Sequence, residues 1–170
     1  MEHETGSYIS FVLGEEYFAI NVTQVLNILQ LVQITKVPTA PDYMKGVINL
    51  RGTVLPIIDI RIKFGMPPIE YKRDTVILVL NVEIDGETVN AGILVDAVKE
   101  VFEINTEEIL PPPGIGSKYK SKFIDGVYKM SDDRFVMLLD IDKVFSTDEL
   151  VMMAATTDTT EATQAEIVGQ

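Results

Sequence analysis

The chain has 170 residues, 46% of them apolar, which is enough for one ordinary domain or two small ones around a real hydrophobic core. Acidic residues outnumber basic residues by 26 to 14, and a net charge of -12 disfavours nucleic acid and anionic membranes as partners. Cysteine is absent and the single histidine is His3, so we expect neither a metal nor a cofactor. No segment approaches the roughly 20 apolar residues of a membrane span, which predicts a cytoplasmic protein.

The N-terminal segments predict a β hairpin followed by an element of ambiguous type. Apolar, aromatic and β-branched residues dominate 8–13 and 17–22, and Gly14-Glu15-Glu16 between them supplies a turn. In segment 25–32 the apolar residues recur at helix-like spacing, although the β-branched content also suits a strand. Both readings of this segment stay open.

A second hairpin is predicted within residues 43–61, where a charged turn separates two strand-like apolar runs. Gly52 supplies the conformational freedom that a tight turn needs, and Arg51 places a guanidinium at the tip. This pattern is typical of a binding surface, although a merely solvated arginine is the simpler alternative. A short helical turn at 60–64 and a strand at 75–82 follow.

The second half of the sequence repeats the first. Three pairs of segments match, namely 19–25 with 92–98, 46–47 with 126–127, and 57–60 with 138–141. Small insertions in loops account for the drift between these pairs. We therefore expect two similar units of short strands, each ending in a helical turn, and such strands with frequent turns favour small barrels.

Two aspartates stand at matching positions of the repeat and raise the question of catalysis. Paired carboxylates, Asp59 and Asp140, are the basis for an aspartate-dependent hydrolase as an alternative function. Neither is followed by the small residues of an aspartic-protease turn, and each precedes a short helical segment. The preferred interpretation is that both cap helices, and no Ser-His-Asp or Cys-His set is available, so we predict a protein that is not an enzyme.

The only basic cluster along the sequence lies in a loop after three prolines. It consists of Lys118, Lys120 and Lys122. A solvated loop is the preferred interpretation, and a docking patch is the alternative.

Several motifs together resemble the CheW family of chemotaxis coupling proteins. They are the stretch 37–41 leading into 46–52, followed by 56–61, and the similarity extends from Tyr8 to Val144. The resemblance implies two SH3-like five-stranded β barrels with short helices, a mainly all-β fold. It also implies an adaptor that couples transmembrane chemoreceptors, the methyl-accepting chemotaxis proteins, to the histidine kinase CheA at arrays on the inner face of the membrane. The same role in a non-flagellar chemosensory pathway is the alternative.

The resemblance and the repeat together give the expected domain organisation. A single domain of two barrel subdomains follows an N-terminal extension and precedes a short helix and a disordered tail. The corresponding ranges are 1–7 for the extension, 8–146 for the domain, 15–80 for one subdomain, 8–14 with 81–146 for the other, and 147–170 for the tail.

The resemblance also implies the partner-binding residues. In the family one barrel packs on the regulatory domain of CheA, the receptor tip lies in the groove between the barrels, and further copies of the coupler are additional candidate partners. Asn49, Arg51 and Gly52 match the family's coupling turn. The segment associated with the receptor groove corresponds to Val25, Leu26, Asn27 and Ile28, for which ordinary core packing is the alternative role. Asn27 replaces a residue that is often acidic in the family.

Overall fold

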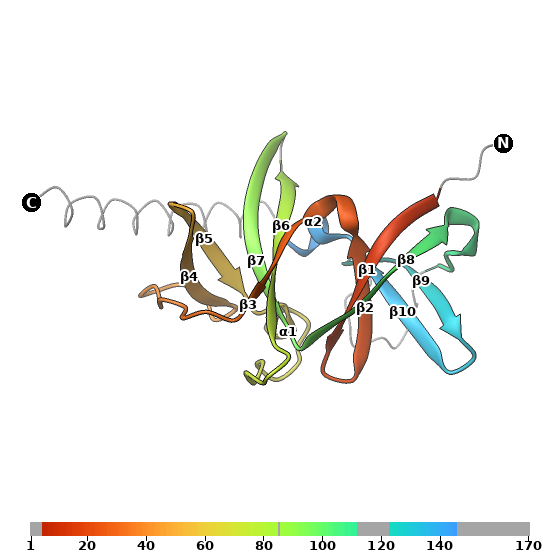
Figure 1. Ribbon diagram of the computed structural model, residues 1–170, viewed down its shortest axis with the longest axis horizontal. Coiled ribbons are helices and arrows are strands. Elements are labelled where there is room, and N and C mark those ends of the chain that lie inside the picture. The colour runs from red at the N-terminus through yellow and green to blue at the C-terminus, as the bar shows by residue number, and fades with distance from the viewer. Residues whose placement is uncertain (1–4, 85, 112–122, 146–170) are drawn as a thin grey trace, which may run out of the picture.

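The structure, a computed structural model, describes residues 5–84, 86–111 and 123–145, and over these ranges the chain is almost entirely β (Figure 1). Segment 25–30, ambiguous in sequence, is a strand. The elements in chain order are β1 (Thr5–Leu13), β2 (Glu16–Asn21), a 3-10 turn (Val22–Gln24), β3 (Val25–Gln30), β4 (Met44–Leu50), β5 (Thr53–Ile58), α1 (Ile60–Lys63), β6 (Val76–Ile84), β7 (Glu87–Val95), β8 (Ala97–Asn105), a 3-10 turn (Thr106–Glu108), β9 (Ile124–Ser131), β10 (Arg134–Leu139) and α2 (Ile141–Val144).

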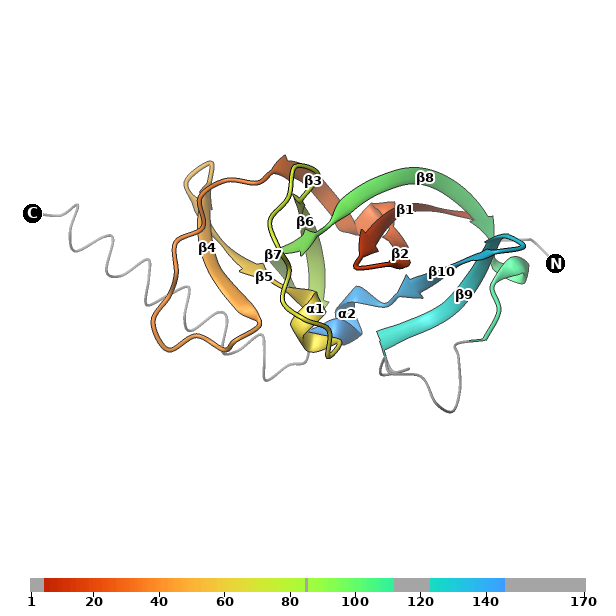
Figure 2. The same ribbon diagram turned by 90° about the horizontal axis from the view of Figure 1, so that it is seen from below.

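The strands form two five-stranded sheets that lie side by side (Figures 1 and 2). One has the order β8-β1-β2-β10-β9 and the other β3-β6-β7-β5-β4. Each is curved into an SH3-like barrel, which confirms the expected fold. Along the described ranges no helix has the length and apolarity needed to cross a membrane.

The sheets divide the chain at points that differ from the expected subdomain boundaries of 15–80 and 8–14 with 81–146. β2 stays beside β1, because the tight turn at Gly14 folds it back antiparallel, and β7 stays beside β6 in the same way. The chain therefore passes from one sheet to the other only after β2 and again after β7. Short-range hairpin pairing, and not the repeat boundary, decides where each crossing falls.

The repeat is confirmed, and its two units exchange strands between the sheets. The first unit, β1–β5, gives two strands to one sheet and three to the other, and the second unit, β6–β10, does the reverse. The parallel pairs that join the units occupy matching positions. Ala19 pairs with Leu138, and its counterpart Gly92 pairs with Ile57. Neither unit can complete a sheet without strands from the other.

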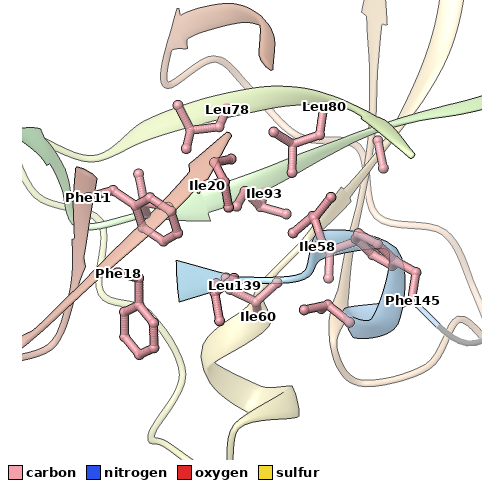
Figure 3. Packing of buried hydrophobic residues seen from close by; sticks show 14 of the residues in the cluster. Phe11, Phe18, Ile20, Ile58, Ile60, Leu78, Leu80, Ile93, Leu139 and Phe145 are labelled. Atoms are coloured by element: carbon pink, nitrogen blue, oxygen red, sulfur yellow. The ribbon is translucent and has the colours of Figure 1, made fainter. Parts of the chain in front are cut away.

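Alternation of side chains along the strands separates three buried clusters. In β6, Leu78 and Leu80 point into a large cluster between the barrels, whereas Ile77 and Val79 fill one barrel's interior. The other barrel encloses a smaller cluster around Ala19 and its neighbours. Figure 3 shows the central cluster, in which side chains from both sheets meet. Because both faces of these strands are buried, the strands appear in the sequence as near-continuous apolar runs. The two barrels form one body, because they share the central cluster.

The two matching aspartates are helix caps, as interpreted from the sequence. Asp59 Oδ1 accepts a hydrogen bond from the Arg61 amide at 3.0 Å, at the start of α1. Asp140 Oδ1 accepts from the Lys143 amide at 3.2 Å, at the start of α2. The loop lysines at 118, 120 and 122 and the predicted C-terminal helix and tail lie outside the described residues.

Candidate partner-binding site

The β4–β5 hairpin is a two-residue turn with Arg51 and Gly52 at its tip. Leu50 pairs with Thr53, and both tip residues have positive φ, 52° for Arg51 and 83° for Gly52, as a type I′ turn requires. The turn is braced from within, because Asn49 Oδ1 accepts a hydrogen bond from the Gly52 amide at 2.9 Å. The predicted Asn-Leu-Arg-Gly motif is therefore a rigid hairpin tip, with Asn49 in a structural role.

Arg51 is an unfavourable residue for its own backbone conformation. Positive φ is comfortable for glycine and tolerated by asparagine, but it costs other residues about 1 kcal/mol or more. The side chain does not repay this cost within the described structure, since it is exposed and forms no ion pair or hydrogen bond there. A strained, exposed cation at a rigid tip is what a contact with another molecule would explain.

The second predicted segment is β3, which forms an edge of its sheet. Its side chains alternate strictly between inward and outward positions. Leu26 and Ile28 point outward and are 52% and 45% exposed, while Val25 packs against the central cluster. Pairing with β6 shifts register between Val25 and Asn27, and Asn27 Oδ1 accepts a hydrogen bond from the Ile28 amide at 2.8 Å. Two large apolar side chains are therefore exposed along this strand edge, as a binding surface would require.

The structure brings the hairpin tip and the β3 edge together around one hollow of about 240 Å³. Arg51 lies at this hollow with Leu26 and Asn27. The two predicted segments are therefore side by side, and the binding roles of these three residues stay predictions. The remaining lining residues are Leu50, Thr53, Leu55, Val79 and Asn90. The predicted residues that do not line it are Asn49, Gly52, Val25 and Ile28. We call this hollow the tip pocket.

The chemistry of the tip pocket suits a side chain from another protein. Leucines form its apolar part, and Arg51 and two amide groups at Asn27 and Asn90 supply donors. Its volume lies below the roughly 300 to 1,000 Å³ of typical small-molecule sites. An apolar anchor that ends in a carbonyl or carboxylate would match these groups, because a guanidinium hydrogen-bonds both strongly.

The carboxylates considered for hydrolysis are not arranged for it. Asp59 is fully buried, and its second oxygen accepts a hydrogen bond from the Ile69 amide at 2.9 Å, with Lys45 Nζ at 4.0 Å. A substrate cannot reach this group. Burial, followed by the negative charge of Asp59, raises the pKa of the Tyr71 phenol. The hydrolase hypothesis therefore loses one of its two carboxylates.

Comparisons with known proteins agree with the resemblance noted in the sequence. The CheW-like domain model matches residues 7–149. The chemotaxis protein CheW of Klebsiella aerogenes is 35% identical over 146 residues, which cover 86% of this chain and 85% of that protein. The probable chemotaxis protein CheW of Rhizobium etli is 37% identical over 141 residues, covering 83% and 88%. The crystal structure of scaffolding protein TtCheW from Thermoanaerobacter tengcongensis superposes with a TM-score of 0.74 at 32% identity, covering 86% of this chain and 91% of that one.

Proposed function

Because this chain belongs to the CheW family, we propose that it couples transmembrane chemoreceptors to the histidine kinase CheA as a scaffold that catalyses no reaction. It works in the cytoplasm, at receptor arrays on the inner face of the membrane. The receptor's cytoplasmic tip binds along the β3 edge, and the regulatory domain of CheA docks on one barrel. Further copies of the coupler contribute to the array.

The observation that carries this proposal is the strained, exposed Arg51 beside the exposed Leu26. Folding alone favours glycine or asparagine at the tip and a polar residue on the edge strand. Both choices run against stability, and a partner that contacts both side chains accounts for them together. Asp59 is buried and caps α1, so a substrate cannot reach its carboxylate, which supports a protein that catalyses no reaction.

The central cluster supports a mechanism in which the two barrels act together on their partners. Side chains from both sheets interlock there, so a partner bound to one barrel is held in a fixed position relative to a partner on the other. A receptor that changes its orientation thereby changes how the kinase is held. The populations of active and inactive kinase shift accordingly, with no bond made or broken.

Titration calorimetry with two separate fragments tests the proposal: the regulatory domain of CheA and the cytoplasmic tip of a receptor. We expect the wild-type chain to bind both fragments. Arg51→Ala should weaken binding of the receptor-tip fragment about tenfold, because a charge-assisted contact of about 1.4 kcal/mol is lost. Lys129→Ala, on the far sheet, serves as the control and should bind as the wild type does. A folded wild-type chain that binds neither fragment would overturn the proposal.

A further inference from the structure

A second cleft, of about 740 Å³, is larger than the tip pocket. It is bounded by the end of β3, the segment that leads into β6, and the first residues of β8. Val76, Ala97 and Val98 are half-buried there and give the cleft an apolar floor. β3 and β8 are the terminal strands of their sheets, so the cleft is bordered by two strand edges. An extended peptide segment suits such a space, because strand edges accept a further segment.

Three exposed cations line this cleft, in a protein whose net charge is -12. They are Lys72, Arg73 and Lys99, and the lining also includes one acidic residue, Asp74. None of the three cationic side chains pairs with another residue of the described ranges. The Lys72 backbone amide donates a hydrogen bond to Thr75 Oγ1 at 2.8 Å, and substituting the Lys72 side chain leaves that bond intact. We call this hollow the basic cleft.

The other cations of the described chain mostly have partners, which makes this cluster unusual. Carboxylates accompany Lys45, Arg61, Lys129 and Lys143, and aromatic rings lie near Lys63 and Arg134. Within the described ranges the cations left without such a partner are Lys36, Arg51 and the three of the basic cleft. Three of these five therefore gather in one cleft. Such a concentration of unpaired positive charge favours an anionic occupant.

The chain itself carries a segment of matching charge beyond Phe145, the last described residue. Residues 146–170 include no lysine or arginine, and their acidic residues are Asp148, Glu149, Asp158, Glu161 and Glu166. The last of these is followed directly by Ile167 and Val168. The stretch 158–168 thus offers three carboxylates for three cations, and two apolar side chains for the apolar floor.

The connection to the domain is long enough for this stretch to reach the basic cleft. Residues 146–157 separate Phe145 from Asp158, and an extended chain of that length spans up to about 40 Å. A compact domain of this size has a radius of gyration of only about 15 Å. Covalent attachment also gives the segment an effective concentration of roughly millimolar order at the cleft, so a weak interaction suffices to occupy it. A second copy of the chain at micromolar concentration competes poorly with that.

We propose that the acidic segment 158–168 binds in the basic cleft of its own chain. Its carboxylates pair with the three cations, and Ile167 and Val168 pack against the apolar floor. The cations are exposed, so each pair contributes little by itself and salt weakens it. An acidic segment of another protein enters the cleft only if it binds well enough to displace the attached one, so the tail excludes weak competitors. This inference goes beyond the proposed function and does not depend on it.

A spin label on the segment tests the inference, because the chain has no cysteine of its own. Ala165→Cys gives the full-length chain a single labelling position beside Glu166. We expect the label to broaden the NMR signals of the Val98 and Lys99 backbone amides by about half or more at about 50 mM salt, and much less at about 500 mM. Signals of these amides that are unaffected at low salt would overturn the proposal.

Exchanging the charges distinguishes this pairing from a general attraction between an acidic tail and any cation. Lys72→Glu with Arg73→Glu should abolish the broadening. Adding Asp158→Lys with Glu161→Lys to the same chain should restore it, because each pair is re-formed with its signs reversed. This restoration also shows that the first double variant is folded.

A matched control variant separates the cleft from the net charge. Lys36→Glu with Lys129→Glu changes the net charge equally at two residues outside the cleft, and the broadening should persist. If this control loses the broadening as fully as the cleft variant does, net charge is responsible and the basic cleft is not the site.

A mixture of two samples tests whether the segment binds its own chain. Spin-labelled chain without isotopes is mixed with isotope-labelled chain that carries no spin label, so that only a tail reaching another molecule broadens the observed signals. We expect no broadening in the mixture. Broadening there as strong as within one labelled chain would overturn the proposal in favour of a second copy as the occupant. Receptor and kinase are absent from every sample, so each outcome is independent of the proposed function.

Discussion

Arg61 Nη1 lies 2.9 Å from Asp96 Oδ2, and this ion pair joins α1 to the point where the chain leaves one sheet for the other. The same carboxylate accepts a hydrogen bond from the Gly14 amide at 2.6 Å, in the turn between β1 and β2. Arg61 Nε also donates to the Pro67 carbonyl at 2.9 Å. One mostly buried pair therefore ties together both barrels, because its side chains are only 14% and 16% exposed.

Replacing Asp96 with alanine should destabilise the fold by about 2 to 4 kcal/mol, since it leaves the Arg61 charge and the Gly14 amide without their acceptor. Urea denaturation measures this change. Asp132→Ala is the control, because Asp132 forms an exposed pair with Lys129 and its loss should leave the urea midpoint unchanged. Equal midpoints for the two variants would show that the Asp96 pair adds nothing to stability.

Matching glycines permit a close chain crossing in each barrel. A Cβ on Gly46 would lie 2.1 Å from the Thr35 carbonyl oxygen, and a Cβ on Gly126 would lie 2.8 Å from that of Leu110. Thr35 and Leu110 each form a β bridge to the residue that follows the glycine. Glycine at both matching positions of the repeat thus meets a steric need, since only glycine leaves room for the bridging backbone.

Gly46→Ala should destabilise the fold by about 3 kcal/mol or more, because its φ of 147° and the contact with backbone both oppose a side chain. Gly65→Ala isolates the conformational part of this effect. Gly65 has a φ of 77° but nothing lies within 4 Å of its Cβ position, so we expect a cost of about 1 kcal/mol. Thermal unfolding of both variants should show the larger loss for Gly46. The reverse order would contradict the steric explanation.

Local features of the fold were predictable from sequence, and long-range pairing was not. The hairpin at Arg51 and the caps at Asp59 and Asp140 depend on neighbouring residues, so composition and spacing identify them. The repeat also predicted two similar units. The strand exchange depends on parallel pairs such as Ala19 with Leu138, between residues far apart in the sequence. Periodicity carries no information about such pairs, and this is why the subdomain boundaries differ.

The candidate site, too, was only partly predictable from sequence. Arg51 and Leu26 were predicted and lie at one pocket, but Asn90 reaches that pocket from β7 through sheet pairing that no motif signals. A cleft of about 740 Å³ lined by Lys72, Arg73 and Lys99 was not predicted, because Lys99 is distant in sequence from the other two cations. A run of basic residues is visible in a sequence, whereas cations from β8 and from the segment that leads into β6 form a cluster only after folding.

The raised pKa of Asp125 should make the stability of the fold depend on pH. Burial, followed by the nearby Asp140 carboxylate, raises the pKa of Asp125, while Lys143 lowers it by less. A carboxyl whose pKa is raised on folding ionises less readily in the folded state, so the free energy of unfolding falls as pH rises through that range. Asp125→Asn should therefore raise the melting temperature slightly, by about 1 to 2 °C, at neutral pH.

The sign of the Asp125 effect is checked by melting the same variant in acid. At about pH 3 the wild-type carboxyl is largely protonated, so the gain should vanish. Lys143 retains Asp140 at 3.7 Å in the variant, which limits the loss of ion pairing. A gain that persists unchanged in acid would indicate a cause other than ionisation.

Arg51→Asn should separate the role of the arginine in binding from its role in the fold. Asparagine accepts the positive φ of 52° and suits the first position of a type I′ turn, so the melting temperature should hold or rise by a few degrees. Affinity for the receptor-tip fragment should nevertheless fall about tenfold, as for Arg51→Ala. Calorimetry and thermal melting of the same sample give both quantities. If stability and binding instead fall together, Arg51 supports the hairpin and its strain has no functional meaning.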